Sequence, residues 1–107
     1  MSLKTGNAVL DKSKAFAIRI VLLYKYLTTE AGEREFVMSK QLLRGGTSIG
    51  ANVRESRRAQ SSKDFITKLY VSLKEADETA YWLELMKETG YLTPDMFESL
   101  YLIVKSC

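Results

Sequence analysis

The chain has 107 residues, with 16 Lys or Arg, 13 Asp or Glu, one Cys and no His, and its net charge is +3. A chain of this length makes one domain, so we expect a single domain over residues 1–107. The absence of histidine excludes serine–histidine and cysteine–histidine nucleophile pairs and an ordinary zinc enzyme site, so we expect a protein that is not an enzyme and uses no cofactor.

The first predicted helix covers about residues 11–29 and follows a segment, 1–10, that we expect to be flexible. One face of this helix repeats at steps of four, three and four: Phe16, Ile20, Leu23 and Leu27. The apolar run is shorter than the roughly 20 residues that span a membrane, and it contains Arg19 and Lys25. With no signal-peptide pattern before it, the sequence predicts a soluble, cytoplasmic protein that makes no membrane contact.

A second apolar row lies on the same predicted helix at steps of four: Ile18, Leu22 and Tyr26. A surface helix usually carries only one apolar stripe, facing the core. We therefore predict that these three residues form an oligomer interface with another copy of the chain. The alternative is a central helix that the other three helices cover.

The second predicted helix covers about residues 34–58 and contains an unusual cluster of small residues around Gly45, Gly46 and Gly50. Its apolar stripe stays in phase across them: Leu42, Gly46, Ile49 and Val53. Each glycine costs about 1 kcal/mol in a helix relative to alanine. We expect the bared backbone to permit close packing of another helix, and a kink is the alternative.

The third predicted helix covers about residues 62–88. Ser61 is a suitable N-cap, and Asp64 lies in the first turn, where a negative charge is favourable. The predicted buried seam alternates threes and fours: Ile66, Leu69, Leu73, Ala76, Ala80 and Leu83. Gly90 can end this helix in a left-handed conformation.

The fourth predicted helix covers about residues 94–107, with Thr93 as N-cap and Pro94 at the first helical position. Its apolar face consists of Phe97, Leu100, Tyr101 and Val104. Four helices with short connections, and no strand pattern, predict an all-α protein with the fold of an antiparallel up-and-down four-helix bundle.

Three glutamates suggest a weaker alternative, a carboxylate metal site. Glu75 and Glu78 have the i, i+3 spacing of di-metal bundle sites, and Glu55 could face them. Because histidine ligands are absent, we favour a solvated or salt-bridged face, with Lys74 and Arg54 as candidate partners. The prediction is that no metal is bound.

Positive charge gathers in the middle of the chain. Residues 40–68 hold seven basic and two acidic residues, a net +5, whereas residues 69–107 hold three basic and seven acidic, a net −4. Arginine suits phosphate because its planar fork donates two parallel hydrogen bonds. The residues we predict to contact nucleic-acid phosphates are Arg44, Arg54, Arg57, Arg58, Lys63 and Lys68. The alternative is that these cations only balance a helix C-terminus.

Residues 41–55, QLLRGGTSIGANVRE, resemble the signature of a small bacterial four-helix-bundle family, also called the 23S rRNA intervening-sequence or S23 ribosomal proteins. The resemblance covers about residues 7–100. Further positions agree in register: Phe16, Arg19, Tyr24, Ser61, Asp64–Ile66, Lys68, Leu69, Lys74–Ala76, Glu78, Thr79, Tyr81–Leu83 and Gly90–Leu92.

The resemblance implies an antiparallel four-helix bundle that assembles into a homopentameric ring. Similar accessory proteins of diversity-generating retroelements are basic pentamers that bind nucleic acid and a reverse transcriptase, and this implies RNA or DNA as partner. The fourth helix departs from the family by being short. About 14 residues span roughly 21 Å, against more than roughly 35 Å for the second and third helices, so we expect one end of the bundle to be uncovered.

The sequence thus predicts a non-enzymatic, self-associating bundle, with a pentamer favoured, that binds nucleic acid, preferably RNA, through the basic region at the junction of the second and third helices. Backbone contacts should dominate, because no base-reading motif is present. The alternative is an interaction scaffold whose basic region meets an acidic protein partner.

Overall fold

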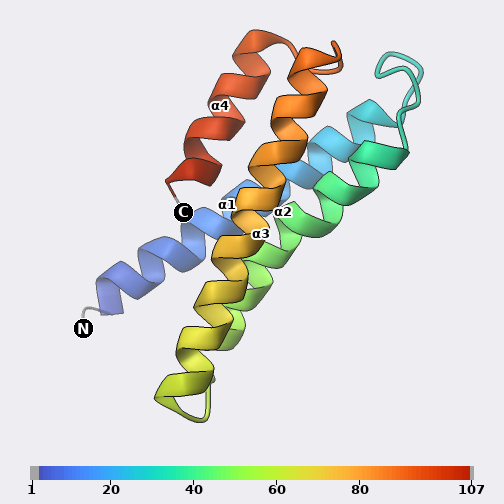
Figure 1. Ribbon diagram of the computed structural model, residues 1–107. Coiled ribbons are helices and arrows are strands. Elements are labelled where there is room, and N and C mark those ends of the chain that lie inside the picture. Colours follow the sequence, from blue (N-terminus) through green and yellow to red (C-terminus); the bar gives the residue numbers. More distant parts are fainter. Residues whose placement is uncertain (1–2, 107) are drawn as a thin grey trace.

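The computed structural model describes the backbone of residues 3–106 and the side chains of residues 8–106. It contains four helices, α1 (Leu3–Leu27), α2 (Val37–Ser56), α3 (Ser62–Glu88) and α4 (Pro94–Lys105) (Figure 1). No strand occurs in this part of the chain. The molecule measures 46 × 22 × 19 Å, and the predicted all-α four-helix bundle is confirmed.

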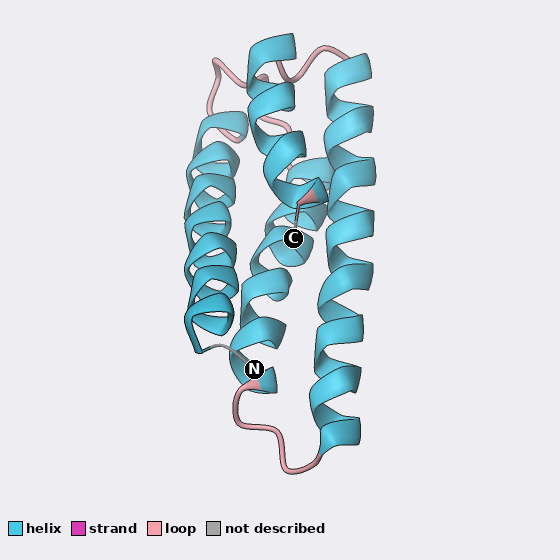
Figure 2. Ribbon diagram, turned by 90° about the vertical axis from the view of Figure 1, so that its left-hand side faces the viewer, coloured by secondary structure: helices cyan, strands magenta, loops and turns pink. Residues whose placement is uncertain are grey.

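The helices run up and down in sequence order. α2 packs against α1 and α3, and α4 packs against α3 and, over a smaller area, against α1. Figure 2 shows α4 between α1 and α3 at one end of the molecule only. A hydrogen bond from Lys12 Nζ to Ser106 Oγ, 3.2 Å long, joins α1 to the chain just after α4.

The predicted apolar stripes of α1 and α2 form the core of the bundle. The fully or nearly fully buried members are Phe16, Ile20, Leu23, Leu27, Leu42, Gly46, Ile49 and Val53. On α4, Leu100 and Val104 are buried, while Phe97 and Tyr101 are half-buried and stack on each other at 4.7 Å. Spacing alone therefore located these buried faces.

The α1–α2 loop shifts two helix bounds from their predicted places. α1 ends at Leu27 and α2 begins at Val37, because Glu33 and Arg34 adopt positive φ angles of 62° and 53° that no α-helix contains. At the other end α1 begins at Leu3, so the described part of the segment expected to be flexible, 3–10, is helical.

The later helix ends match their predicted caps. Ser61 Oγ accepts a hydrogen bond from Asp64 N at 3.1 Å, and Thr93 Oγ1 accepts one from Met96 N at 3.2 Å. Gly90 has a φ of 89°, the left-handed conformation that ends α3. α2 ends at Ser56 rather than 58, and α4 ends at Lys105. Cys107 lies outside the described residues.

The glycines of α2 permit close packing, as expected, and the helix runs through them unbroken. A Cβ on Gly46 would lie 2.9 Å from Ile20 Cγ1, and a Cβ on Gly45 would lie 2.8 Å from Thr79 Oγ1. α1 and α3 therefore approach α2 more closely than an alanine at either position would allow.

The short α4 changes which part of α3 is buried. Its 12 residues span about 18 Å, whereas the 27 residues of α3 span about 40 Å. The predicted seam is therefore wrong at Ile66 and Leu73, which are 63% and 53% exposed, because α4 ends before it reaches their level. The buried seam of α3 is instead Ser72, Ala76, Thr79, Ala80, Leu83 and Met86.

Candidate nucleic-acid interface

Arg44 connects α2 to α3. Its Nη1 lies 3.0 Å from Glu75 Oε1, and its Nη2 bonds Glu78 Oε1. The hydrogen bond to Glu75 raises the pKa of Arg44; partial burial opposes this, and the charges of both glutamates add to it. The partner is Arg44 rather than the predicted Lys74 or Arg54. This guanidinium, predicted to contact phosphate, is thus already neutralised within the chain.

Lys68 is paired in the same way. Its Nζ donates to Glu55 Oε1 at 2.9 Å, and this hydrogen bond raises the pKa of Lys68. All three carboxylates of the metal alternative are consequently bound to cations. Within residues 8–106, no group of three or more His, Cys, Asp or Glu side chains is arranged to hold a metal ion.

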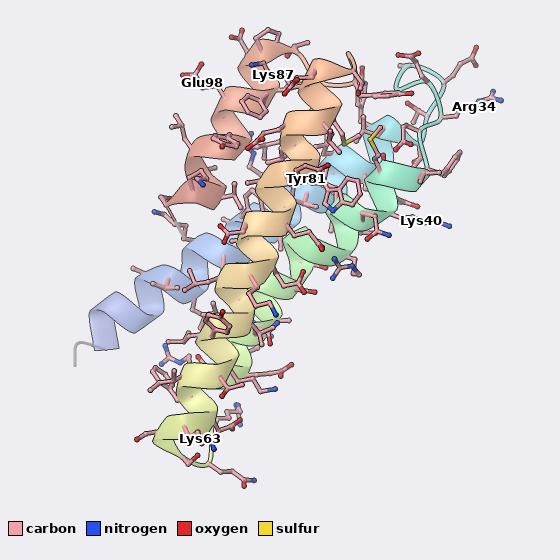
Figure 3. All side chains as sticks on the ribbon, viewed as in Figure 1. Arg34, Lys40, Lys63, Tyr81, Lys87 and Glu98 are labelled. Carbon is pink, nitrogen blue, oxygen red and sulfur yellow. The ribbon has the colours of Figure 1, made fainter. Side chains whose placement is uncertain are left out.

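The other four predicted residues form what we call the basic end: Arg54, Arg57, Arg58 and Lys63. All four are exposed, and none of their side chains forms an ion pair or hydrogen bond with a residue that the structure describes. They lie in the last turn of α2, the connecting turn and the first turn of α3. Figure 3 places Lys63 at this end of the molecule.

Local structure explains why these cations come together. Arg54 and Arg57 lie at the α2 C-terminus, where the helix dipole favours positive charge. The chain then turns within five residues, and Ser61 caps α3. Asp64 Oδ2 accepts from Gln60 N at 3.4 Å, so one acidic side chain of this region serves the turn.

Negative charge gathers at the opposite end of the bundle. The α1–α2 loop supplies Glu30, Glu33 and Glu35, and the region where α3 leads into α4 supplies Glu88, Asp95 and Glu98. Figure 3 places Glu98 and Arg34 far from Lys63. Arg34 and Lys87 also lie at this end, which therefore has six acidic and two basic residues. The basic end and this acidic end are two poles of an elongated molecule.

Lys14 is a further cation near the basic end that the sequence prediction missed. It is exposed on α1 and makes no ion pair or hydrogen bond with any part of the chain that is described. The α1–α2 register brings it there, since a Cβ on Gly50 would lie 3.4 Å from the carbonyl oxygen of Ser13. The small residues of α2 were the signal that α1 crosses at this level.

Two apolar strips face outward. The α1 strip contains the predicted interface residues Ile18, Leu22 and Tyr26, which are 52%, 57% and 44% exposed, together with Val21. The α3 strip contains Ile66, Tyr70, Leu73 and Tyr81, the last three lying four, seven and fifteen residues after Ile66. The covered central helix, the alternative for α1, is thereby contradicted in the single chain.

None of the helices in the described part of the chain is long and apolar enough to cross a membrane.

Comparison with known proteins relates this architecture to one family. No curated protein matches the chain. The chain is similar to a protein of unknown function from the S23 ribosomal protein family of Bacteroides thetaiotaomicron, whose crystal structure was determined at 1.70 Å. The two share 56% sequence identity with a TM-score of 0.91, over 94% of this chain and 88% of that one. The model of the 23S rRNA-intervening sequence protein family matches residues 6–107, and the chain belongs to that family.

Proposed function

We propose that the protein is a non-enzymatic, self-associating bundle that binds nucleic acid, preferably RNA, through the basic end. The observation that carries the proposal is the group of four exposed cations that have no partner among the described residues, Arg54, Arg57, Arg58 and Lys63. Each one that neutralises a phosphate releases counterions and adds to the affinity. The names of the family and of its crystallised member refer to ribosomal RNA and the ribosome, and this favours RNA.

Two of the six predicted phosphate contacts are already paired with carboxylates of the chain. Arg44 and Lys68 hold α2 and α3 together through Glu75, Glu78 and Glu55. Turning either cation toward a phosphate would leave a carboxylate unpaired. We therefore assign phosphate binding to the four unpaired cations and a connecting role to Arg44 and Lys68.

Self-association is supported by the α1 and α3 strips. They differ in composition and lie on different helices, so contact between them would be heterologous, and heterologous contacts that close form rings. A ring repeats the basic end once per subunit and multiplies the phosphate contacts. The family resemblance favours five subunits.

RNA binding can be measured by fluorescence anisotropy with a structured RNA over a salt titration. We expect affinity to fall steeply with salt. The double variant Arg57→Gln/Arg58→Gln should lose about tenfold or more in affinity and flatten the slope of log K against log salt by about one unit per lost contact.

The matched control is Lys25→Gln/Lys40→Gln, which removes the same charge from two exposed lysines away from the basic end. It should leave the slope close to that of the wild type. Equal losses of RNA affinity in both variants would show that only the net charge of the protein matters. Absence of binding at low salt would overturn the proposal and leave an acidic protein as the partner of the basic end.

Self-association can be measured by sedimentation velocity at micromolar concentration. The wild type should sediment as a closed oligomer, and Leu22→Lys should shift it to a monomer with an unchanged circular dichroism spectrum, because Leu22 is outside the core. Ser99→Lys, an exposed control on α4 outside both apolar strips, should leave the oligomer intact. A monomeric wild type would contradict assembly without affecting the RNA measurement.

A further inference from the structure

A groove of about 320 Å³ lies between α1 and α2, next to the basic end. α1 contributes Leu10, Lys14 and Ala17, and α2 contributes Gly50, Ala51 and Arg54. Its volume lies at the lower limit of sites that hold small organic ligands. The groove is therefore large enough for a compact chemical group.

Small side chains create this groove. α1 and α2 are in ordinary van der Waals contact at Gly50, where a Cβ would lie 3.4 Å from the Ser13 carbonyl oxygen. Beside the crossing, Ala17 and Ala51 extend no further than Cβ, so the space above them stays open. Leu10 supplies an apolar wall, and most of the surface offered to a ligand is hydrocarbon.

The edge of the groove is positively charged. Lys14 and Arg54 come from opposite helices, and neither side chain forms an ion pair or hydrogen bond with the described chain. Glu55 also borders the groove, but its carboxylate accepts a hydrogen bond from Lys68 Nζ at 2.9 Å. A ligand thus meets an apolar floor with two available cations beside it.

Resting on the proposed function, we propose that this groove receives the base of one unpaired nucleotide, with Lys14 and Arg54 binding the adjoining phosphates. A nucleobase has apolar faces, and the sugar holds a phosphate at a nearly fixed distance from it. This arrangement matches an apolar floor between two cations. Arg58 follows Arg54 by four residues, about one helical turn, and lies in the turn just after α2. A nucleic-acid strand that leaves the groove past Arg54 would therefore next meet Arg58.

A groove that receives one base would make the interface prefer single-stranded over double-stranded nucleic acid. In a duplex each base is stacked and paired, and entering the groove would require flipping it out. Single strands and loops offer unstacked bases at no such cost. The basic end alone would bind both forms through phosphates, so the groove is what distinguishes them.

The test compares a single-stranded oligonucleotide with a duplex of the same sequence. Ala51→Leu fills the groove without changing charge, and we expect it to weaken single-strand binding about tenfold with an unchanged salt slope, while duplex binding changes less than twofold. Ala31→Leu, the same substitution at an exposed position of the α1–α2 loop outside the groove, should change neither. Ala17→Leu fills the groove from the other helix and should reproduce the effect.

The outcomes separate this inference from the function on which it rests. One outcome is a wild type that binds RNA while both filling variants keep its single-strand affinity within twofold. In that case the groove does not bind a base, and the basic end alone remains the proposed RNA-binding surface. If the wild type binds neither oligonucleotide at low salt, both fail. If the filling variants change the sedimentation coefficient instead, a second copy occupies the groove and the proposal is overturned.

A mononucleotide distinguishes the base from its phosphate. In NMR titrations, uridine monophosphate should shift the amide signals of Gly50 and Ala51, and inorganic phosphate at the same concentration should shift them less than half as far. Equal shifts would show that an anion alone accounts for binding and would contradict a site for the base.

Discussion

Glu35 lies two residues before the start of α2 and holds the first turn of that helix with one carboxylate. Oε2 accepts from Val37 N at 3.1 Å and Met38 N at 3.2 Å, while Oε1 accepts from Ser39 N at 2.8 Å and Ser39 Oγ at 2.9 Å. Burial by itself would raise the pKa of Glu35, but these four hydrogen bonds outweigh it and lower the pKa. A helix N-terminus favours this negative charge.

A pH-dependent stability follows from this cap. A carboxyl whose pKa is lower in the folded state stabilises the fold above its unfolded pKa, and this gain is lost as the pH falls through the folded pKa. Glu35→Gln removes the charge and one acceptor, so we expect a loss of about 1 kcal/mol at pH 7, as for other caps. In urea unfolding, the gap between variant and wild type should be full above about pH 5 and shrink below the ordinary glutamate pKa of about 4.3.

The control for this prediction is Glu33→Gln in the same loop. The Glu33 side chain is exposed and makes no ion pair or hydrogen bond with any residue described in the structure. The unfolding curve of Glu33→Gln should match that of the wild type both above about pH 5 and below about pH 4.3. A gap for Glu35→Gln that stays constant with pH would contradict the role of the charge.

At the scale of the helices, the α1–α2 crossing depends on two glycines with different surroundings. A Cβ on Gly46 would lie 2.9 Å from Cγ1 of Ile20, a side chain that is fully buried and cannot move aside. Gly46→Ala should therefore destabilise the protein by about 1–3 kcal/mol through overpacking, although alanine is the better helix former.

Gly50→Ala is the matched comparison. Its Cβ would meet the Ser13 carbonyl at 3.4 Å, an ordinary contact. The gain in helix propensity should then leave the protein equally stable or more stable by up to about 1 kcal/mol. Thermal unfolding of both variants checks the pair, and equal effects at the two positions would contradict a close approach confined to Gly46.

Spacing in the sequence was sufficient for two local features, the buried stripes and the later caps, but it misplaced the bounds of the α1–α2 loop. The stripe that includes Phe16 and Ile20 follows from helical periodicity, and the Ser61 and Thr93 caps follow from side chains that bond within three residues. Ile66 was misplaced because the burial of α3 depends on where α4 ends, which no pattern within α3 records.

The candidate site was predictable only as a list of cations. Which of them are paired depends on the register between helices: Arg44 meets Glu75, 31 residues away, and Lys68 meets Glu55, 13 residues away. Lys14 escaped notice because it lies far from the basic middle of the sequence and joins it only through the α1–α2 crossing. Such pairings require the assembled bundle.

At the scale of the whole molecule, the two charged poles lie at the ends of a body 46 Å long. An approaching polyanion is attracted by the basic end and repelled by the acidic one. The resulting orientation speeds association at low ionic strength and fades as salt shortens the screening length to about 8 Å. Lowering the salt should therefore raise the association rate for RNA far more than it lowers the dissociation rate in stopped-flow experiments.

The short α4 covers only one half of α3, and the backbone amides of the covered and uncovered halves should exchange at different rates. In hydrogen exchange, the slowest amides should be those near Leu83 and Met86, whose side chains are fully buried. Amides near the exposed Ile66 and Tyr70 should exchange markedly faster. The basic end lies on the faster half. Adding RNA should slow amide exchange at the basic end and leave exchange in the half that contains α4 unchanged. Bound RNA would then protect the half of α3 that the short α4 leaves uncovered.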